Sequence, residues 1–346
     1  MKERDTSADK RAPRPTIRDV SAAAGVSIKT VSRVLNNEKY VSVETKTLVE
    51  TAMKSLHFRA SAAARSLAGH RSHQVALICD NPNPWYVYEV QSGTRAVCQK
   101  HHVRLLAQPY DRNSPTLLGD ICDLIDQVQP DGLILTPPAS DQAEVLVELM
   151  RRGTPFVRIQ PGSQIDLTSS VHIDNDRAAY DMTCHLLDLG HRRIGFIVGD
   201  RGYAASGQRL GGYVRALAER GVGLDLANVR QGRFDFASGA EAAEELLAQS
   251  DRPTAIFASS DDMAAGALTT AHRLGIAVPK ALSIAGFDDT AFATIVWPSL
   301  TTIRQPIRLL AEQATDLLLS PGTAIERRLI AHELVIRDST AASPEV

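Results

Sequence analysis

The chain has few cysteines, no long hydrophobic run and no secretory leader. Its four cysteines, among 346 residues, show no C-x-x-C spacing, so we expect buried free thiols in a reducing compartment and no disulfide framework. No stretch of about 18 uncharged apolar residues occurs, which excludes a membrane-spanning helix and a membrane partner. Residues 1–14 are charged and lack an apolar segment, so we expect a disordered leader there and no signal peptide.

The sequence also lacks the common signatures of enzymes. It contains neither the G-x-S-x-G nucleophile elbow nor the G-x-x-x-x-G-K-[ST] phosphate loop. The adjacent carboxylates Asp261-Asp262 and Asp288-Asp289 resemble acid/base pairs, but neighbours on one chain rarely face the same way. His101-His102 has no credible third metal ligand. We therefore expect no catalytic residue, no metal site and no cofactor.

Charge is distributed unevenly along the chain. Residues 1–72 carry 14 Lys and Arg against 7 Asp and Glu, a net charge of +7, whereas the whole chain has −2 and the remainder therefore −9. A basic head on an acidic body is expected when one end of a protein binds a polyanion. The acidic remainder disfavours contact between the larger part and DNA.

Residues 16–36 predict two short helices joined by a tight turn. Thr16 and Asp19 form a capping-box pattern at the first helix, Gly25 suits the turn, and Ser27 is an N-cap for the second helix. The second helix is amphipathic, with an apolar side formed by residues 31, 34 and 35. Its polar and cationic face is what a DNA recognition helix needs. The alternative is an ordinary helical hairpin.

A third helix is predicted over Val43–His57, and it completes a small core with Val20, Val31, Val34 and Leu48. The alanine-rich segment that follows is too short to form a stable helix alone, so it can fold against a partner or act as a flexible linker.

From residue 74 apolar strands alternate with helices, which predicts parallel sheets covered on both faces. So many units suggest two doubly wound lobes with a ligand crevice between them. The expected strands are 75–79, 103–107, 132–136, 155–159, 171–173, 194–198, 228–231, 254–258 and 283–286; the expected helices are 87–101, 117–128, 142–152, 178–189, 208–220, 239–249 and 263–274.

The motifs of the chain resemble the LacI/GalR family of bacterial transcriptional regulators over residues 15–338. The matching stretches are T-I-R-D-V (16–20), A-G-V-S-x-x-T-V-S-R-V-L-N (24–36), A-A-A-R-S-L (62–67), I-D-N-D (173–176), L-G-H-R-R-I-G (189–195), R-L-x-G-Y (209–213), R-P-T-A-I-F (252–257), D-x-M-A-x-G-A-L (261–268), S-I-A-G-F-D-D (283–289) and P-S-L-T-T-I (298–303). The resemblance implies an all-α three-helix head (15–58), a hinge helix (59–73), a two-lobed periplasmic-binding-protein-like α/β effector domain (74–340) and a tail (341–346).

The resemblance also implies which residues bind DNA. The base-reading residues would be Ile28, Lys29 and Arg33, of which Arg33 can grip a guanine with two donors. Phosphate contacts would come from Thr16, Ser27, Thr30, Ser32 and Asn36. In the hinge, Leu67 would wedge into the minor groove with support from Arg65, although an ordinary linker is the alternative.

Effector-binding residues are implied in the same way. Arg209 and Asp288 occupy effector positions of the family, and they supply the donors and acceptors that a sugar needs. Aromatic wall positions are matched by Tyr86 and Phe234, with Trp85 beside them. Asp261 recurs in a family motif and is included, although it could instead cap a helix, as could Asp174. Departures from the family at residues 159–160 and 260 leave a purine or another metabolite open.

We therefore expect a cytoplasmic homodimer that binds a palindromic double-stranded operator and represses transcription under control of a small-molecule effector, first of all a carbohydrate. Because terminal leucine heptads are absent, a coiled-coil tetramer is not expected. The rival interpretations are a solute-binding protein of transport, which would need a secretory signal and no DNA-binding head, and a small-molecule enzyme.

Overall fold

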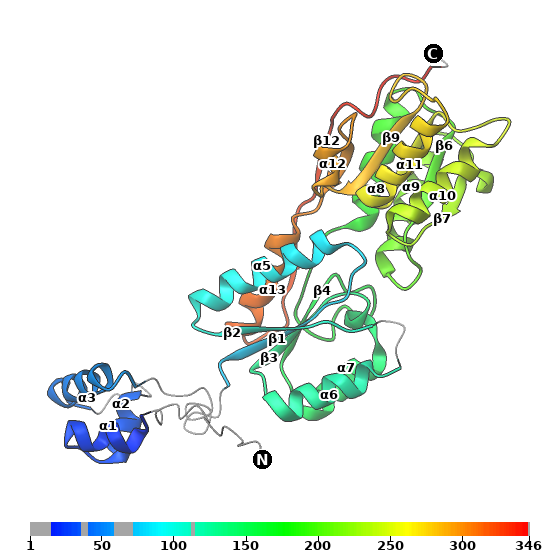
Figure 1. Ribbon diagram of the computed structural model, residues 1–346. Coiled ribbons are helices and arrows are strands. Elements are labelled where there is room, and N and C mark those ends of the chain that lie inside the picture. Colours follow the sequence, from blue (N-terminus) through cyan, green and yellow to red (C-terminus); the bar gives the residue numbers. More distant parts are fainter. Residues whose placement is uncertain (1–14, 36–40, 59–71, 112–114, 345–346) are drawn as a thin grey trace, which may run out of the picture. The chain divides into compact units, whose positions relative to one another are not determined.

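The computed structural model describes residues 15–35, 41–58, 72–111 and 115–344. Within these ranges the chain divides near His73 into a small helical head and a larger α/β unit (Figure 1). No helix in the described ranges is long and apolar enough to cross a membrane.

The head consists of α1 (Ile17–Ala24), α2 (Ile28–Leu35) and α3 (Val43–Ser55). At the start of α1, the carboxylate of Asp19 accepts hydrogen bonds from the backbone N–H and the hydroxyl of Thr16, at 2.7 and 2.8 Å. Gly25 follows α1 with φ of 64°, a left-handed conformation that glycine adopts without a steric penalty. The hydroxyl of Ser27 accepts from the N–H of Thr30 at 3.1 Å. The predicted helix-turn-helix is confirmed.

A small apolar core holds the three helices together. Its buried members are Val20, Val31, Val34, Val49 and Ala52. The prediction that Leu48 belongs to this core is wrong, because its side chain is 56% exposed. Neighbouring residues of a helix point about 100° apart, so the turn of α3 that buries Val49 directs Leu48 to solvent.

The first lobe of the α/β unit is built on a parallel sheet with the strand order β11-β5-β4-β3-β1-β2. Its strands are β1 (Gln74–Ile78), β2 (Arg104–Gln108), β3 (Gly132–Leu135), β4 (Phe156–Ile159), β5 (Ser170–His172) and β11 (Arg327–Leu329). One face is covered by α5 (Pro84–Lys100) and α13 (Ile307–Leu319), and the other by α6 (Leu117–Val128) and α7 (Ala143–Arg152) (Figure 1).

The second lobe has the strand order β12-β10-β9-β8-β6-β7, with β12 antiparallel and the others parallel. Its strands are β6 (Ile194–Val198), β7 (Val229–Gln231), β8 (Ala255–Ala258), β9 (Ser283–Asp288), β10 (Thr301–Arg304) and β12 (Glu333–Val335). Its helices are α8 (Asn175–Asp188), α9 (Ala204–Glu219), α10 (Phe236–Leu247), α11 (Asp261–Arg273) and the short α12 (Phe292–Ile295). Alternate residues of β6 serve opposite faces, because Phe196 packs with the α8–α9 layer and Ile197 with the α10–α11 layer.

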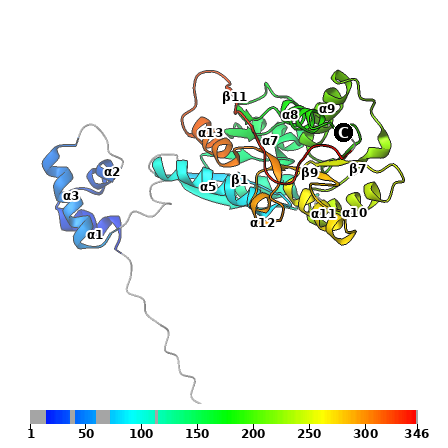
Figure 2. The ribbon, with the colours of Figure 1, turned by 90° about the horizontal axis from the view of Figure 1, so that it is seen from above.

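The chain passes between the lobes after β5, after β10 and after β11. Figure 2 shows both lobes of the α/β unit from above. The predicted pair of doubly wound sheets is confirmed. The sequence analysis missed β10 and α13, and β11 and β12, which lie close together in the chain, belong to different lobes.

The end of the described chain packs along the second lobe. The hydroxyl of Ser339 donates to the carbonyl of Ile284 at 2.5 Å, and the N–H of Ala341 donates to the hydroxyl of Ser283 at 3.0 Å. The N–H of Ser343 reaches the carbonyl of Leu189 at 2.8 Å. Residues 339–343, which include the first part of the expected tail, therefore stabilise this lobe.

Candidate functional site

A cavity lies between the two lobes, at the carboxyl ends of their strands. It contains about 510 Å³ of space outside the protein atoms, part of it open to solvent. Its lining residues are Asn81, Asn83, Tyr86, Pro137, Gln160, Tyr203, Ala205, Arg209, Phe234, Ser260, Asp288 and Gln305. In parallel α/β sheets, loops at this edge bring side chains from separate strands together, which makes it the usual place for a ligand.

Arg209, on α9, is the buried cation of this cavity. Its Nε donates to the side-chain oxygen of Asn175 at 3.0 Å, and its Nη1 donates to the carbonyl of Ser259 at 2.6 Å. The guanidinium carbon lies 3.5 Å from the ring centroid of Phe287. Burial lowers the pKa of Arg209 to about 10, so the side chain remains charged at neutral pH. The guanidinium is fixed before any ligand arrives.

Asp288, the last residue of β9, supplies the opposing carboxylate. Its Oδ1 accepts from the Nε2 of Gln305 at 2.6 Å and lies 3.8 Å from the Nη2 of Arg209. Burial raises the pKa of Asp288 to about 7, although Arg209 and the Gln305 bond act in the opposite direction. The carboxyl group is therefore divided between its neutral and ionised forms near neutral pH, and a ligand can shift that balance.

Aromatic rings form the apolar part of the wall. Phe234 has φ of 64°, and its ring packs edge-on against that of Tyr203 at a centroid distance of 5.4 Å. A side chain at Gly199 would overlap the ring of Phe234, so this glycine provides the space that the ring occupies. Tyr86, on α5, is buried at the cavity, and this burial raises the pKa of its hydroxyl well above the usual value.

Side-chain amides connect the lobes at the cavity. The Nε2 of Gln160, which follows β4, donates to the Oε1 of Gln305 at 3.1 Å. The Nδ2 of Asn83, the N-cap of α5, donates to the carboxylate of Asp262 on α11 at 2.7 Å. The sequence analysis noted residue 160 only as a departure from the family and assigned no role to Asn83 or Gln305. Asn83 lies at a helix cap and Gln305 where the chain passes between the lobes, so only the folded topology brings these amides together.

The head presents a second surface with functional side chains. Ser27, just before α2, is exposed, as are Ile28, Lys29 and Arg33 on the helix, while Thr30 and Ser32 are half-buried. Lys29 and Arg33 are four residues apart, so they lie on the same side of the helix. Ile28 is 45% exposed, which makes it an apolar contact point on an otherwise polar surface. The buried valines of α2 hold this face outward.

The comparisons with known proteins find matches for both parts of the chain. Residues 16–61 match the model of the bacterial regulatory proteins of the lacI family, and residues 183–340 match that of a periplasmic binding protein-like domain. The HTH-type transcriptional regulator DegA of Bacillus subtilis is 34% identical, and the alignment covers 94% of this chain and 98% of that protein. The HTH-type transcriptional repressor PurR of Photobacterium profundum is 33% identical, with the same coverage of both chains. The chain belongs to the LacI family.

Solved structures of LacI-family regulators share its fold. A lac repressor dimer bound to operator and the anti-inducer ONPF is similar with a TM-score of 0.86 and 27% identity, covering 95% of this chain and 100% of that one. A complex of the regulator CelR with cellobiose has a TM-score of 0.72 and 28% identity, covering 94% and 100%. This LacI-family chain is thus a DNA-binding transcriptional regulator with an effector-binding domain.

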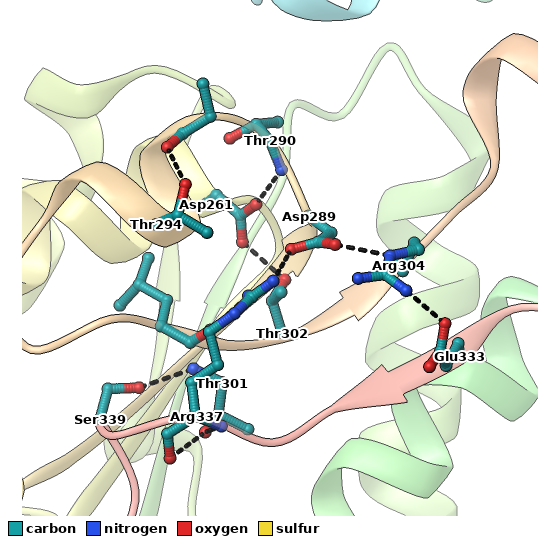
Figure 3. Close-up of polar contacts among 12 residues, drawn as sticks. Asp261, Asp289, Thr290, Thr294, Thr301, Thr302, Arg304, Glu333, Arg337 and Ser339 are labelled. Atoms are coloured by element: carbon teal, nitrogen blue, oxygen red, sulfur yellow. Dashed lines mark hydrogen bonds and ion pairs between the residues drawn. The ribbon is translucent and has the colours of Figure 1, made fainter.

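Two residues expected at the effector site lie elsewhere. Trp85 does not line the cavity; it is 40% exposed and packs against Tyr88 at a centroid distance of 5.5 Å. Asp261 is fully buried behind the cavity, where its carboxylate accepts from the hydroxyl of Thr302 and the N–H of Thr290, both at 2.6 Å (Figure 3). Both residues are neighbours of cavity residues along a helix, and the helical turn directs them away.

The alternative role of helix cap applies to Asp174, whose carboxylate accepts from the N–H of Arg177 at 2.8 Å. For α11 the N-cap is Ser260, not Asp261. The expected DNA contacts Asn36, Arg65 and Leu67 fall outside the described residues. Among the described residues, no group of three His, Cys, Asp or Glu side chains is arranged to hold a metal ion.

Proposed function

We propose that this LacI-family regulator represses transcription as a homodimer on a palindromic operator, and that a neutral sugar or sugar derivative in the interlobe cavity changes its operator affinity. One α2 helix reads only a few base pairs, so two copies are needed for a site of useful specificity. Because the partner is bacterial chromosomal DNA, we place the protein in the cytoplasm.

At the DNA, we assign base contacts to Ile28, Lys29 and Arg33. Arg33 can donate to O6 and N7 of a guanine, whereas Ile28 can only offer an apolar contact, for example to a thymine methyl group. Phosphate contacts are assigned to Thr16, Ser27, Thr30 and Ser32, together with Asn36. The net positive charge of the head supports a large salt-dependent contribution to affinity.

The observation that carries the effector proposal is the buried pair formed by Arg209 and Asp288. The pair has no net charge when both groups are ionised, so it favours a neutral ligand. Arg209 can donate to ligand oxygens, while Asp288 can accept from hydroxyl groups. The rings of Tyr86 and Phe234 add apolar walls, which suit the carbon faces of a sugar. The CelR structure with cellobiose supports this ligand class.

A purine or related planar base is the second candidate. The amides of Gln160 and Gln305 each offer one donor and one acceptor group, and this alternation matches the edge of a nucleobase. Phe234 and Tyr86 could also stack on a flat ring. Enzyme activity is not part of the proposal, since the relatives with matching chains are regulators.

A two-part experiment tests the proposal. The operator is first selected from random duplex DNA with the full-length protein, and a thermal-shift screen then compares neutral sugars with nucleobases. A ligand present at 100 times its Kd stabilises the native state by about 2.7 kcal/mol, which a melting curve resolves. We expect a sugar to raise the Tm of the wild type but not of Arg209→Ala, and to change operator affinity in fluorescence anisotropy.

Arg273→Ala serves as a matched control, because this arginine forms a surface ion pair with Glu244 away from the cavity. If only nucleobases raise the Tm, the proposed effector class would be a purine and not a sugar. A ligand response that survives Arg209→Ala would refute the assignment of the cavity, and failure to select any preferred DNA sequence would refute site-specific binding.

A further inference from the structure

The turn that follows β9 has an unusual backbone. Asp288 and Asp289 are adjacent non-glycine residues with positive φ angles, 109° and 56°. Residues with a Cβ avoid this region, and Asp288 lies outside even the left-handed helical well. Such a conformation persists only when the surrounding structure holds it in place, and it is often found at ligand sites. The contacts that hold this turn therefore determine where the Asp288 side chain points.

An ion-pair clamp holds the second residue of the turn. The carboxylate of Asp289 accepts hydrogen bonds from the Nε of Arg304 at 2.6 Å and from the Nη2 of Arg337 at 2.5 Å (Figure 3). The Asp289 side chain is only 10% exposed, so solvent competes weakly for these charge-assisted bonds. Arg304 lies on β10 directly beside Asp288 in the sheet register, whereas Arg337 comes from the segment after β12. Two separate segments thus converge on one carboxylate.

Both sides of the clamp are anchored in the second lobe. The Nη1 of Arg337 donates to the carbonyl of Leu300 at 2.8 Å, and the Arg337 N–H donates to the hydroxyl of Thr301 at 3.0 Å. On the other side of the turn, the N–H of Thr290 is held by Asp261 (Figure 3). With residues 289 and 290 fixed in this way, the carboxylate of Asp288 lies at the cavity beside Gln305.

We propose that Asp289 and Arg337 are positioning residues of the effector site, whose ion pair holds the β9 turn so that the Asp288 carboxylate enters the cavity. The two adjacent aspartates then have different tasks: Asp288 meets the ligand, and Asp289 fixes the backbone. The inference rests on the proposed function only in the identity of Asp288 as an effector contact.

The pKa of Asp288 depends on whether its carboxyl group stays in the buried place, so its titration tests this positioning without any ligand. The charged groups that face Asp288 are Arg209 from α9, Asp262 from α11 and, behind it, Asp261. Replacing Arg337 by methionine removes a nearby cation, and through electrostatics alone this change would raise the pKa of Asp288. Release of the turn has the opposite effect, because a carboxyl group that leaves its buried place returns toward its ordinary pKa.

We would measure the titration midpoint of Asp288 by ¹³C NMR of the full-length protein with labelled aspartate, assigned by comparison with Asp288→Asn. We expect the midpoint to fall by at least about one pH unit in Arg337→Met. Arg273→Met, which removes a surface cation paired with Glu244 at the far end of α11 from the turn, should leave it unchanged. A midpoint that rises or stays constant in Arg337→Met would overturn the proposal.

If Arg337→Met does not fold, Asp289→Asn and Arg337→Lys replace it, and a wild-type midpoint in both would overturn the proposal. A separate measurement addresses the effector. With the sugar identified by the thermal-shift screen, Arg337→Met should weaken binding by about tenfold or more. If Arg337→Met lowers the Asp288 midpoint but the wild type binds no sugar, the positioning role stands and the proposed effector class is refuted. The failure of the positioning proposal and the failure of the proposed effector class are therefore distinguishable.

Discussion

Effector binding should depend on pH through Asp288. The pKa of this carboxyl group is raised to about 7 by burial, so in the free protein it is largely neutral at pH 6 and largely ionised at pH 8. A sugar that donates hydroxyl hydrogens to Asp288 binds the ionised form, and its presence therefore lowers the pKa. Sugar affinity therefore falls as the pH drops below about 7 and becomes constant above it.

The magnitude follows from the ionised fraction. With a midpoint near 7, that fraction is about one tenth at pH 6 and about nine tenths at pH 8, so the Kd should be about tenfold larger at pH 6, which corresponds to about 1.4 kcal/mol. In Asp288→Asn the dependence should disappear. Affinity there should also fall by about 10-fold to 150-fold at pH 8, because a hydrogen bond to a charged group contributes about 1.5–3 kcal/mol.

Isothermal titration calorimetry at pH 6, 7 and 8 tests this prediction. Buffers with different ionisation enthalpies show whether a proton is released, and we expect release at pH 6 but not at pH 8. Asp262→Asn is the control for the other cavity-side carboxyl group, whose pKa is also raised by burial, to about 6. Affinity that is constant between pH 6 and 8, or that rises at low pH, would refute the assignment of Asp288 as a hydrogen-bond acceptor.

Three further changes test other parts of the molecule. Arg33→Ala should reduce affinity for the selected operator by about 1–3 kcal/mol and for random DNA by much less, as measured by anisotropy, and equal losses would contradict a base contact. Gly199→Ala should weaken effector binding and spare operator binding, because the new methyl group displaces the ring of Phe234; unchanged calorimetry would show that the ring can move without consequence. Ending the chain at Asp338 removes nine hydrogen bonds between residues 339–343 and the second lobe and should lower the Tm by more than about 10 °C, whereas an unchanged Tm would show that the last residues do not stabilise it.

Local patterns in the sequence were sufficient for the helix-turn-helix and for most of the strand–helix alternation. The caps at Thr16 and Ser27 and the turn at Gly25 depend on neighbouring residues, and the structure has all three. The strand 194–198 was predicted to the residue, because a continuous apolar run is the signature of a strand buried on both faces. Helix α13 was missed although its buried residues recur at helical spacing over residues 307–318, and only its place on the first lobe depends on a chain crossover.

The effector site also contains residues that motifs predict and residues that only the fold brings together. Arg209 and Asp288 were predicted from motifs, and the structure brings both to the cavity. Motifs do not specify the direction of adjacent side chains, which is why Asp261 was expected in a cavity that its neighbour Ser260 lines. Gln160 and Gln305 are 145 positions apart in the chain and meet only where it passes between the lobes, so no spacing rule could pair them.

The hydrogen bonds of Gln305 suggest how ligand binding and lobe position are connected. Its Nε2 donates to Asp288 in the second lobe, while its Oε1 accepts from Gln160 in the first. We infer that a sugar hydroxyl that donates to Asp288 competes with the first of these bonds, and that a Gln305 side chain that turns away gives up the second as well. One side chain thus couples the ligand to an interlobe contact. A coupling free energy of about 1–3 kcal/mol is typical of allosteric proteins, and one or two net hydrogen bonds of about 1 kcal/mol each are enough to supply it. The Gln305 bonds therefore supply enough free energy to couple effector binding to the interlobe contact.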